Sequence, residues 1–480
     1  MIPRWRPSRL MADLGELSAF AKRRDPTLPD GILAENIEEW RRHKTISFAS
    51  EVVGTALVLG RETEAEEAAR FIKSAGKKAA PIQREIAESI LSPVTRDKTS
   101  AGEEPRGQIR LLRQRLNQDP HNPVAWSDIS LEYACLGLAN KARRAMKVAV
   151  ALAPAHRFII RSAARLFVHL GEPDYAHYLL LRADSTAVDP WLMAAEIAVA
   201  GIAEKASEYA KVGRKLLQAE KFAPWHLSEL AGALGTLEFE HGNRRGARKF
   251  FSHALVQPTA NTVGQARWVQ SATGLPLLDS LALNTRLAFE ARAWQEFYDG
   301  GWQESFDQTQ RWLDDEPYSS RPAVLGSYVA GSILGQYDEA VRMARAGLKA
   351  NPNEPTLLNN LIFSLINCGE LDEAEQNLDK LKSGHLEEGH KILLKATTGL
   401  LCFRQGNANL GREYYLAAIQ MAGEAKNRIL QTRAAIFLAL EETRAKSPHI
   451  QEATARAFKY AESATYPDFP LLLTRLKADR

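Results

Sequence analysis

The stretch Gly347–Gln376 reads GLKANPNEPTLLNNLIFSLINCGELDEAEQ and contains two predicted helices joined by a turn. Asn-Pro opens a turn, and an apolar segment with helical spacing follows it. Gly369 ends this first helix, and the Asp-Glu-Ala that follows shortly afterwards starts a second one. The stretch has no recognisable nucleophile, general base or set of metal ligands. It therefore predicts a structural helix-turn-helix unit.

The composition narrows the classes of protein to which the chain can belong. Of its 480 residues 45% are apolar, and the formal net charge of +4 is far below the concentrated positive charge of proteins that bind mainly phosphates. Cys135, Cys368 and Cys402 are too few and too scattered for a disulfide framework or a paired-cysteine metal site. The sequence has no signal-peptide core and no window near the roughly 20 apolar residues of a membrane span. We expect a cytoplasmic protein with no membrane partner; nucleic acid is possible but not indicated.

The helix-turn-helix pattern recurs with a constant period. Small residues mark the turns between helices at Gly137 and Gly171, 34 residues apart, and at Gly301, Gly335 and Gly369, again in steps of 34. Small residues also open the second helices, at Ala142, Ala176, Ala340 and Ala374. Only a small side chain at these positions lets the two helices approach closely.

One unit carries a longer signature. From Pro123 onwards the characteristic residues appear in the order Trp126, Ile129, Tyr133, Gly137, Ala142, Met146, Ala149 and Pro154. This order resembles the tetratricopeptide repeat. The resemblance covers about residues 108–445 and implies an all-α fold, a right-handed superhelical solenoid of helix-turn-helix repeats. It also implies a concave groove lined mainly by the first helix of each repeat.

The rest of the chain is divided by composition and rhythm. Residues 1–91 are expected to form an N-terminal helical module, with a possible degenerate repeat that has Gly60 at its turn and Ala65 at the start of its second helix. Residues 92–107 are polar and contain proline, which predicts a flexible linker. Within the 108–445 array, about residues 259–286 form an insertion with an extra helix and a loop. Residues 446–480 are expected to supply a capping helix and tail.

The motifs of known chemistry are absent or incomplete. HLEEGH, from His385 to His390, separates its histidines by five residues instead of the four of a zinc protease, and Gly389 is expected to break a helix there. There is no GxSxG elbow and no dinucleotide fingerprint. We therefore expect no catalytic residues, no metal and no cofactor, although an enzyme activity in residues 1–95 stays open.

Candidate binding residues lie on the predicted first helices. Arg157, Arg161 and Arg165 recur every fourth residue, so they share one helix face. The resemblance implies that Arg161 and Arg165 point into the groove, with His169 one turn further on, where they would hold carboxylates of a bound peptide. We expect both arginines to be solvent-facing; a merely solvated face, or burial in ion pairs with neighbouring helices, is the alternative.

Further candidates are polar or aromatic. Asn359 and Asn360 sit at comparable groove-facing places, where their amides could pair with the backbone of an extended peptide. Arg292 is placed similarly. Most tryptophans are expected to be packing wedges, but Trp268 lies in the predicted insertion and is a candidate contact.

These features lead to three functional hypotheses. The first is a non-enzymatic interaction scaffold or adaptor that binds an acidic or extended segment of a partner protein in the groove. The second is an RNA-binding or nuclease-regulating helical repeat, motivated by the basic cluster of Lys141, Arg143, Arg144 and Lys147. The third is a nuclease or hydrolase activity in the first hundred residues.

Overall fold

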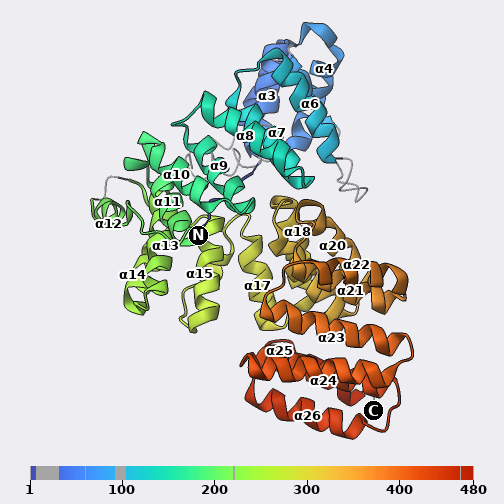
Figure 1. Ribbon diagram of the computed structural model, residues 1–480. Coiled ribbons are helices and arrows are strands. Elements are labelled where there is room, and N and C mark those ends of the chain that lie inside the picture. Colours follow the sequence, from blue (N-terminus) through green and yellow to red (C-terminus); the bar gives the residue numbers. More distant parts are fainter. Residues whose placement is uncertain are drawn as a thin grey trace. The chain divides into compact units, whose positions relative to one another are not determined.

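The computed structural model describes residues 2–6, 32–59, 61–79, 81–91, 104–219, 222–464 and 466–478. Regular structure in these ranges is helical and includes no strand, which confirms the all-α prediction (Figure 1). The chain divides into two compact units, one of Pro7–Glu104 and one that combines Met1–Arg6 with Pro105–Arg480. No helix in the described ranges has both the length and the apolar character that crossing a bilayer requires.

The smaller unit is a helical module with its own apolar core. Its helices are α2 (Ile32–Arg42), α3 (Ile46–Leu59), the 3-10 turn Glu62–Ala65, α4 (Glu66–Ser74), the 3-10 turn Gly76–Lys78 and α5 (Pro81–Leu91). Leu33, Trp40, Val52 and Ile72 are buried together in its core. Gly60, the predicted turn residue, lies outside the described residues, as do residues 92–103 of the predicted linker. The last four linker positions, 104–107, belong to the first turn of α6 (Glu104–Gln118).

The larger unit is an array of helix pairs (Figure 1). In chain order its helices are α7 (Pro123–Cys135) and α8 (Ala139–Leu152), α9 (Arg157–His169) and α10 (Pro173–Arg182), the 3-10 turn Asp184–Ala187, α11 (Pro190–Ile202) and α12 (Ala210–Gln218), α13 (Pro224–Glu240) and α14 (Arg244–Ala254), α15 (Ala260–Thr273) and α16 (Ser280–Leu283), α17 (Phe289–Asp299) and α18 (Trp302–Asp315), α19 (Ser320–Tyr328) and α20 (Tyr337–Ala350), α21 (Pro355–Cys368) and α22 (Leu371–Ser383), α23 (Glu388–Arg404) and α24 (Ala408–Glu424), α25 (Arg428–Arg444) and α26 (Ile450–Ser463), and α27 (Phe469–Ala478).

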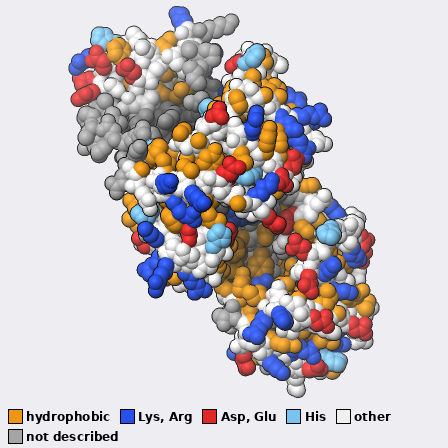
Figure 2. Space-filling model, turned by 60° about the vertical axis from the view of Figure 1, so that its left-hand side comes forward, with side chains coloured by type: hydrophobic (Ala, Val, Ile, Leu, Met, Phe, Trp, Pro, Cys, Tyr) orange, Lys and Arg blue, Asp and Glu red, His pale blue; other side chains and the backbone are white. Residues whose placement is uncertain are grey.

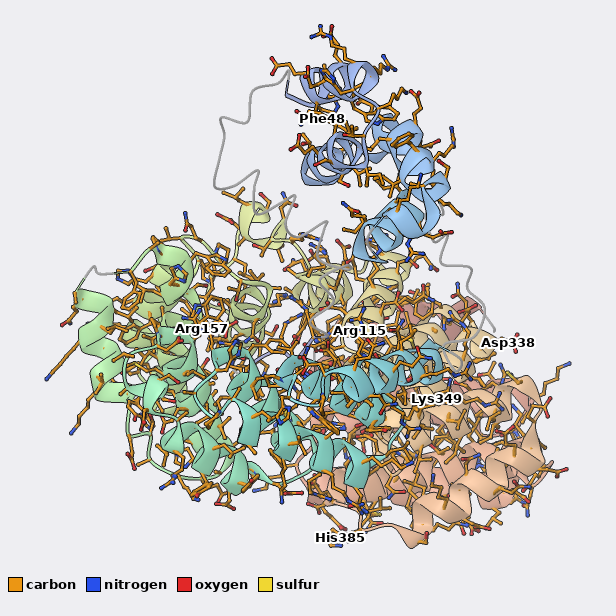
Figure 3. All side chains as sticks on the ribbon, turned by 90° about the horizontal axis from the view of Figure 1, so that it is seen from above. Phe48, Arg115, Arg157, Asp338, Lys349 and His385 are labelled. Atoms are coloured by element: carbon orange, nitrogen blue, oxygen red, sulfur yellow. The ribbon has the colours of Figure 1, made fainter. Side chains whose placement is uncertain are left out.

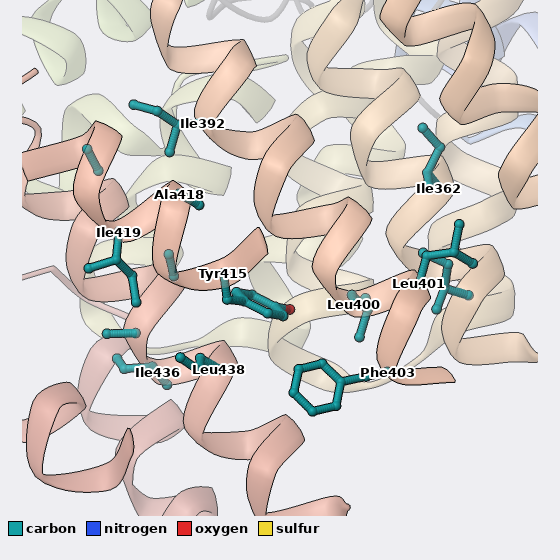
Figure 4. Packing of buried hydrophobic residues seen from close by; sticks show 14 of the residues in the cluster. Ile362, Ile392, Leu400, Leu401, Phe403, Tyr415, Ala418, Ile419, Ile436 and Leu438 are labelled. Carbon is teal, nitrogen blue, oxygen red and sulfur yellow. The ribbon is translucent and has the colours of Figure 1, made fainter. Parts of the chain in front are cut away.

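The stretch Gly347–Gln376 folds as predicted. Pro355 occupies the first turn of α21, where its missing N–H is not needed, and the Glu354 side chain accepts a hydrogen bond from the Leu357 N–H. Gly369 ends the helix in the left-handed conformation, with φ 88°, and α22 begins two residues later. Neighbouring pairs then stack. In the last part of the array, side chains such as Leu400, Tyr415 and Ile436 form one buried cluster from successive helices (Figure 4).

The predicted glycine register needs one correction. The left-handed residue between α17 and α18 is Gly300, with φ 83°, whereas Gly301 has φ −79° and precedes α18. The step from there to Gly335 is therefore one residue longer than the usual period. The extra residue is accommodated at the end of the first helix, where Val329–Leu334 forms a π-helical segment.

The segment predicted as an insertion continues the array. Helix α15 packs between α13 and α17, which is the place of a first helix, and the four-residue α16 stands where a full second helix would be. The array also curves back on itself, because α7 contacts α20. A Cβ atom on Gly137 would lie 2.5 Å from the carbonyl oxygen of Lys349, so only glycine fits this approach (Lys349 is marked in Figure 3).

The unit that starts near Trp191 lacks a turn glycine, and Glu204 takes the left-handed conformation there, with φ 54°. This conformation costs a residue with a Cβ atom about 1 kcal/mol. We expect Glu204→Gly to raise the free energy of unfolding by about that amount, measured by chemical denaturation. Gly171 is the matched control, because it has φ 74° and open space around a Cβ. Gly171→Ala should lower the stability by a similar amount, and a Glu204→Gly protein no more stable than the original would contradict this account.

Candidate binding groove

Residues 2–6 of the chain belong to the larger unit and have no helical or strand structure. The Trp5 side chain is only 1% exposed and belongs to a buried cluster with side chains of α6 to α11 and with Tyr318. The centroids of the Trp5 and Tyr318 rings are 5.4 Å apart. The Asn261 side chain of α15 donates a hydrogen bond of 3.1 Å to the Ile2 carbonyl oxygen. The array therefore already holds one non-helical segment of polypeptide.

The two arginines of this segment, Arg4 and Arg6, form ion pairs with three carboxylates. We call these carboxylates, Glu290, Asp315 and Glu316, the acidic seat. The Arg4 guanidinium lies 3.2 Å from Glu290, 3.3 Å from Asp315 and 3.6 Å from Glu316, and its side chain is 8% exposed. Arg6 pairs with Asp315 at 2.7 Å. Burial alone would raise the pKa of the Glu316 carboxyl, but Arg4 and Arg165 outweigh it and hold that pKa below its ordinary value.

The arginines of α9 are engaged within the chain, which corrects the expectation that they face solvent. Arg161 is 11% exposed and pairs with Glu229 of α13 at 2.6 Å, and it donates a hydrogen bond to the Trp191 carbonyl. The Arg165 guanidinium lies 4.9 Å from the centre of the Tyr318 ring. The curvature of the array supplies these partners, and a helical period in the sequence cannot reveal curvature. As partner-binding residues, both arginines stay a prediction.

His169 follows them on the same helix and is also enclosed. Its ring centroid is 5.6 Å from that of Tyr318. Burial, and then the neighbouring Arg165 cation, lower the pKa of His169 to about 4. The imidazole is therefore neutral near pH 7 and does not offer a positive charge to a ligand.

The remaining candidates differ in their surroundings. Arg292 donates to the Gln308 side chain and to the carbonyls of Leu283 and Thr285, so it fastens the loop after α16 to α17 and α18. Trp268 is 45% exposed and meets Phe239 edge to face, with ring centroids 5.3 Å apart. It presents an aromatic face to solvent, as a contact residue would, and its role stays a prediction.

Asn359 and Asn360 line a cavity of about 440 Å³, the groove cavity, in the second half of the array. Its walls come from α17, α18, α19 and the π-helical segment after it, from α21, α23, α24 and α25, and from Tyr466, and they are mostly apolar and aromatic. The lining includes Trp294, Phe297, Trp312, Arg321, Tyr328, Ser332, Phe363, Ile392, Ala396, Thr397, Arg433, Ala434, Phe437 and Tyr466. Figure 2 shows hydrophobic side chains gathered in a hollow of the larger unit.

Polar groups in the groove cavity are held in place by neighbouring repeats. Asn360 donates to the Val324 carbonyl at 3.2 Å and to the Ser327 hydroxyl at 3.0 Å. Thr397 donates to the Asn359 carboxamide oxygen at 2.7 Å. This bond fixes the orientation of the Asn359 side chain in the cavity wall. Such preorganised carboxamides can pair with the backbone of an extended peptide.

A buried cation closes one side of the cavity. The Arg433 guanidinium lies 4.9 Å from the Tyr328 ring centre and 5.2 Å from that of Tyr466, and it pairs with Asp468 at 3.3 Å. The Tyr328 hydroxyl donates to the same carboxylate. Because Asp468 lies just before α27, this network ties the C-terminal tail to the cavity wall.

The HLEEGH motif has no part in the groove's charge pattern. Helix α23 begins at Glu388, so His385 precedes the helix. Gly389 lies in the first turn, where we expected a break; a glycine is tolerated there because the first N–H groups have no intrahelical partner anyway. His390 Nε2 lies 3.3 Å from the Thr356 hydroxyl. Among the described residues no cluster of His, Cys, Asp and Glu has the geometry to hold a metal ion.

Sequence reasoning missed the acidic seat and its occupant. The sequence does carry a signal for each: WLDDEPY, from Trp312 to Tyr318, is acidic at a repeat boundary, and the chain starts with the basic and aromatic MIPRWR. Nothing in either stretch shows that the two meet. Their contact depends on the curvature of the array.

The helix pairs, their left-handed turn residues and their buried small residues decide the architecture. The larger unit is a tetratricopeptide-like repeat array. No family model and no curated protein matches the chain. Solved structures that it resembles are yeast Tom70, with 15% identity over 86% of this chain and 96% of that one at a TM-score of 0.32; a human IFIT1 dimer with PPP-AAAA, with 14% identity over 79% and 93% at 0.38; and a tetratricopeptide repeat protein from Parabacteroides merdae, with 12% identity over 58% and 98% at 0.27.

The ion pair of Arg161 predicts a stability effect. Arg161→Ala leaves the buried Glu229 carboxylate without its cation, so we expect a loss of about 3 kcal/mol in the free energy of unfolding. Arg157 is the matched control on the same helix, because its side chain is 48% exposed and its partner Asp189 is 12% exposed, whereas Arg161 and Glu229 are 11% and 6% exposed. Arg157→Ala should cost less than about 1 kcal/mol. Equal losses in the two variants, measured by denaturation, would contradict the assignment.

His169 predicts a dependence on pH. Its pKa is about 4 in the folded chain and near 6.5 ordinarily, so between these values the unfolded state binds more protons. The contribution of His169 to stability is therefore lost as the pH falls from 6.5 towards 4. We expect the melting temperature to drop further between pH 7 and pH 5 in the original chain than in a His169→Asn variant. If the melting temperatures of the two proteins fall in parallel with pH, the pKa of His169 is not lowered in the folded chain.

Proposed function

We propose that the protein is a non-enzymatic interaction scaffold that holds an extended segment of a partner protein along the inner face of its repeat array. The observation that carries the proposal is the groove cavity. Its volume of about 440 Å³ falls in the range of cavities that accept ligands, and its lining combines an apolar wall with a few fixed polar groups. This combination suits an apolar or aromatic side chain flanked by peptide backbone, with Asn359 and Asn360 as the backbone partners.

Residues 2–6 give the proposal a second support. They lie on the same array without helical structure, with a tryptophan buried and a carbonyl bonded to an asparagine side chain. The proposal favours an extended segment over an acidic one, because Arg161 pairs with Glu229 and Arg165 lies on Tyr318. Carboxylates of a partner would have to compete for these cations.

An RNA-binding function is the alternative, and the α8 cluster is the observation that bears on it. Lys141, Arg144 and Lys147 are exposed, which favours contact with phosphates. Against this, Arg143 pairs with Glu172 at 2.5 Å, and Lys141 and Lys147 lie over tyrosine rings at 5.8 and 5.3 Å. The cluster is therefore partly engaged within the protein.

Selection from a displayed library of random peptides tests the proposal. We expect selected peptides to share an apolar or aromatic anchor. Ala396→Phe fills the cavity, and we expect it to weaken binding of those peptides at least tenfold, which corresponds to about 1.4 kcal/mol. Ala151→Phe makes the same change on the exposed surface of α8 and should leave binding unchanged. Peptides that bind both variants equally would exclude the cavity, and binding of random RNA that weakens steeply with salt would favour the alternative.

A further inference from the structure

We propose that residues 2–6 are a tethered ligand. The acidic seat and the enclosed site of the Trp5 side chain, which we call the tryptophan pocket, then form a binding site for a basic and aromatic peptide segment supplied by a partner. The inference rests on the proposed function and deepens it, because it names the chemical class of the partner. It also makes residues 2–6 a competitor that controls the partner's access to the acidic seat.

The charges of the seat select a cation. Glu290, Asp315 and Glu316 all lie within 3.6 Å of the Arg4 guanidinium, and their side chains are 5 to 10% exposed. Carboxylates this well buried are unstable without compensating charge. If residues 2–6 leave, Arg165 and Arg321 are the cations still near the seat, so a partner must bring positive charge to replace Arg4 and Arg6. An arginine is favoured because its planar group can contact several carboxylates at once.

The tryptophan pocket selects an aromatic side chain. Trp5 is almost fully enclosed, and it packs on Tyr318 and on the buried side chains of the early repeats. The spacing of one residue between Arg4 and Arg6 places the aromatic group between the two cations. The pattern that the site recognises is therefore an extended Arg-aromatic-Arg.

The fit of the tethered segment is incomplete, which leaves room for a better ligand. Within the described part of the chain, Trp5 Nε1 and Arg6 Nε are buried and have no hydrogen-bond partner. A buried donor without a partner weakens binding. A partner segment that places an acceptor near either atom can displace residues 2–6, although these have the advantage of a high effective concentration.

Two side chains connect the seat to the groove cavity. Trp312 lines the cavity, and its indole N–H donates to Glu316 at 3.0 Å. Arg321 also lines the cavity and pairs with Glu290. The seat and the cavity are therefore neighbours that share the Trp312 and Arg321 side chains.

Peptide binding in trans tests the inference on the full chain. The probe is a fluorescent peptide with the sequence IPRWR, capped at both ends, and the variant is Arg4→Ala with Trp5→Ala. We expect the variant to bind the probe saturably and the original chain to bind it at least tenfold more weakly, because its own segment competes. Probes with Ala in place of Trp, or Glu in place of both Arg, are the controls and should not bind. Adding Glu316→Gln to the variant should weaken binding about tenfold.

Several results would overturn the inference. A folded variant that does not bind the probe has no accessible seat, and equal binding by both chains places the probe elsewhere. Melting curves check the fold, and the milder Arg4→Gln keeps the tryptophan in place. If the variant with Arg4→Ala and Trp5→Ala and the Arg4→Gln variant both unfold, residues 2–6 are a permanent part of the core. The Ala396→Phe protein reports on the cavity alone. If the probe binds at the seat but Ala396→Phe weakens the binding of none of the selected peptides, only the proposed function is contradicted.

Discussion

The close approach of the two helices within each repeat is the constraint on which the rest of the array depends. The small residues that open the second helices, Ala142, Ala176, Ala340 and Ala374, are completely buried. A larger side chain at these positions would push the helices apart, because protein interiors are close-packed. One pair cannot bury its apolar face alone, so each pair stacks on the next and the stacking generates a curved array.

The curvature converts local repeats into long-range contacts. Helix α7 contacts α20, and in the turn after α7 a side chain on Gly137 cannot fit beside the Lys349 carbonyl. Arg161 reaches Glu229, 68 positions further along the chain. Arg4 reaches Glu290 across 286 positions. The long-range contacts of the larger unit are thus paired charges and enclosed aromatic rings that the chain itself supplies.

The sequence predicts contacts between residues close in the chain far better than contacts between distant ones. The helix pairs were predictable because caps, small residues and turn glycines act within a few residues, as the stretch Gly347–Gln376 illustrates. The misplacement of Gly301 had a local cause, since a π-helical segment added one residue to the repeat. Asn359 and Asn360, which the repeat register places at groove-facing positions, line the cavity, and their role as peptide contacts stays a prediction. The environment of Arg161 and the whole acidic seat depend on curvature, which no local pattern in the sequence reports.

Residues 2–6 are held on the array through the acidic seat. A double-mutant cycle on Arg4 and Glu290 tests it most directly, because these residues touch only if the segment lies in the seat. The free energies of unfolding of the original chain, Arg4→Ala, Glu290→Ala and the double variant give the coupling between the two side chains. The account predicts a coupling of about 1 kcal/mol or more. Single effects that add within about 0.3 kcal/mol would show that the two residues do not interact, and would contradict it.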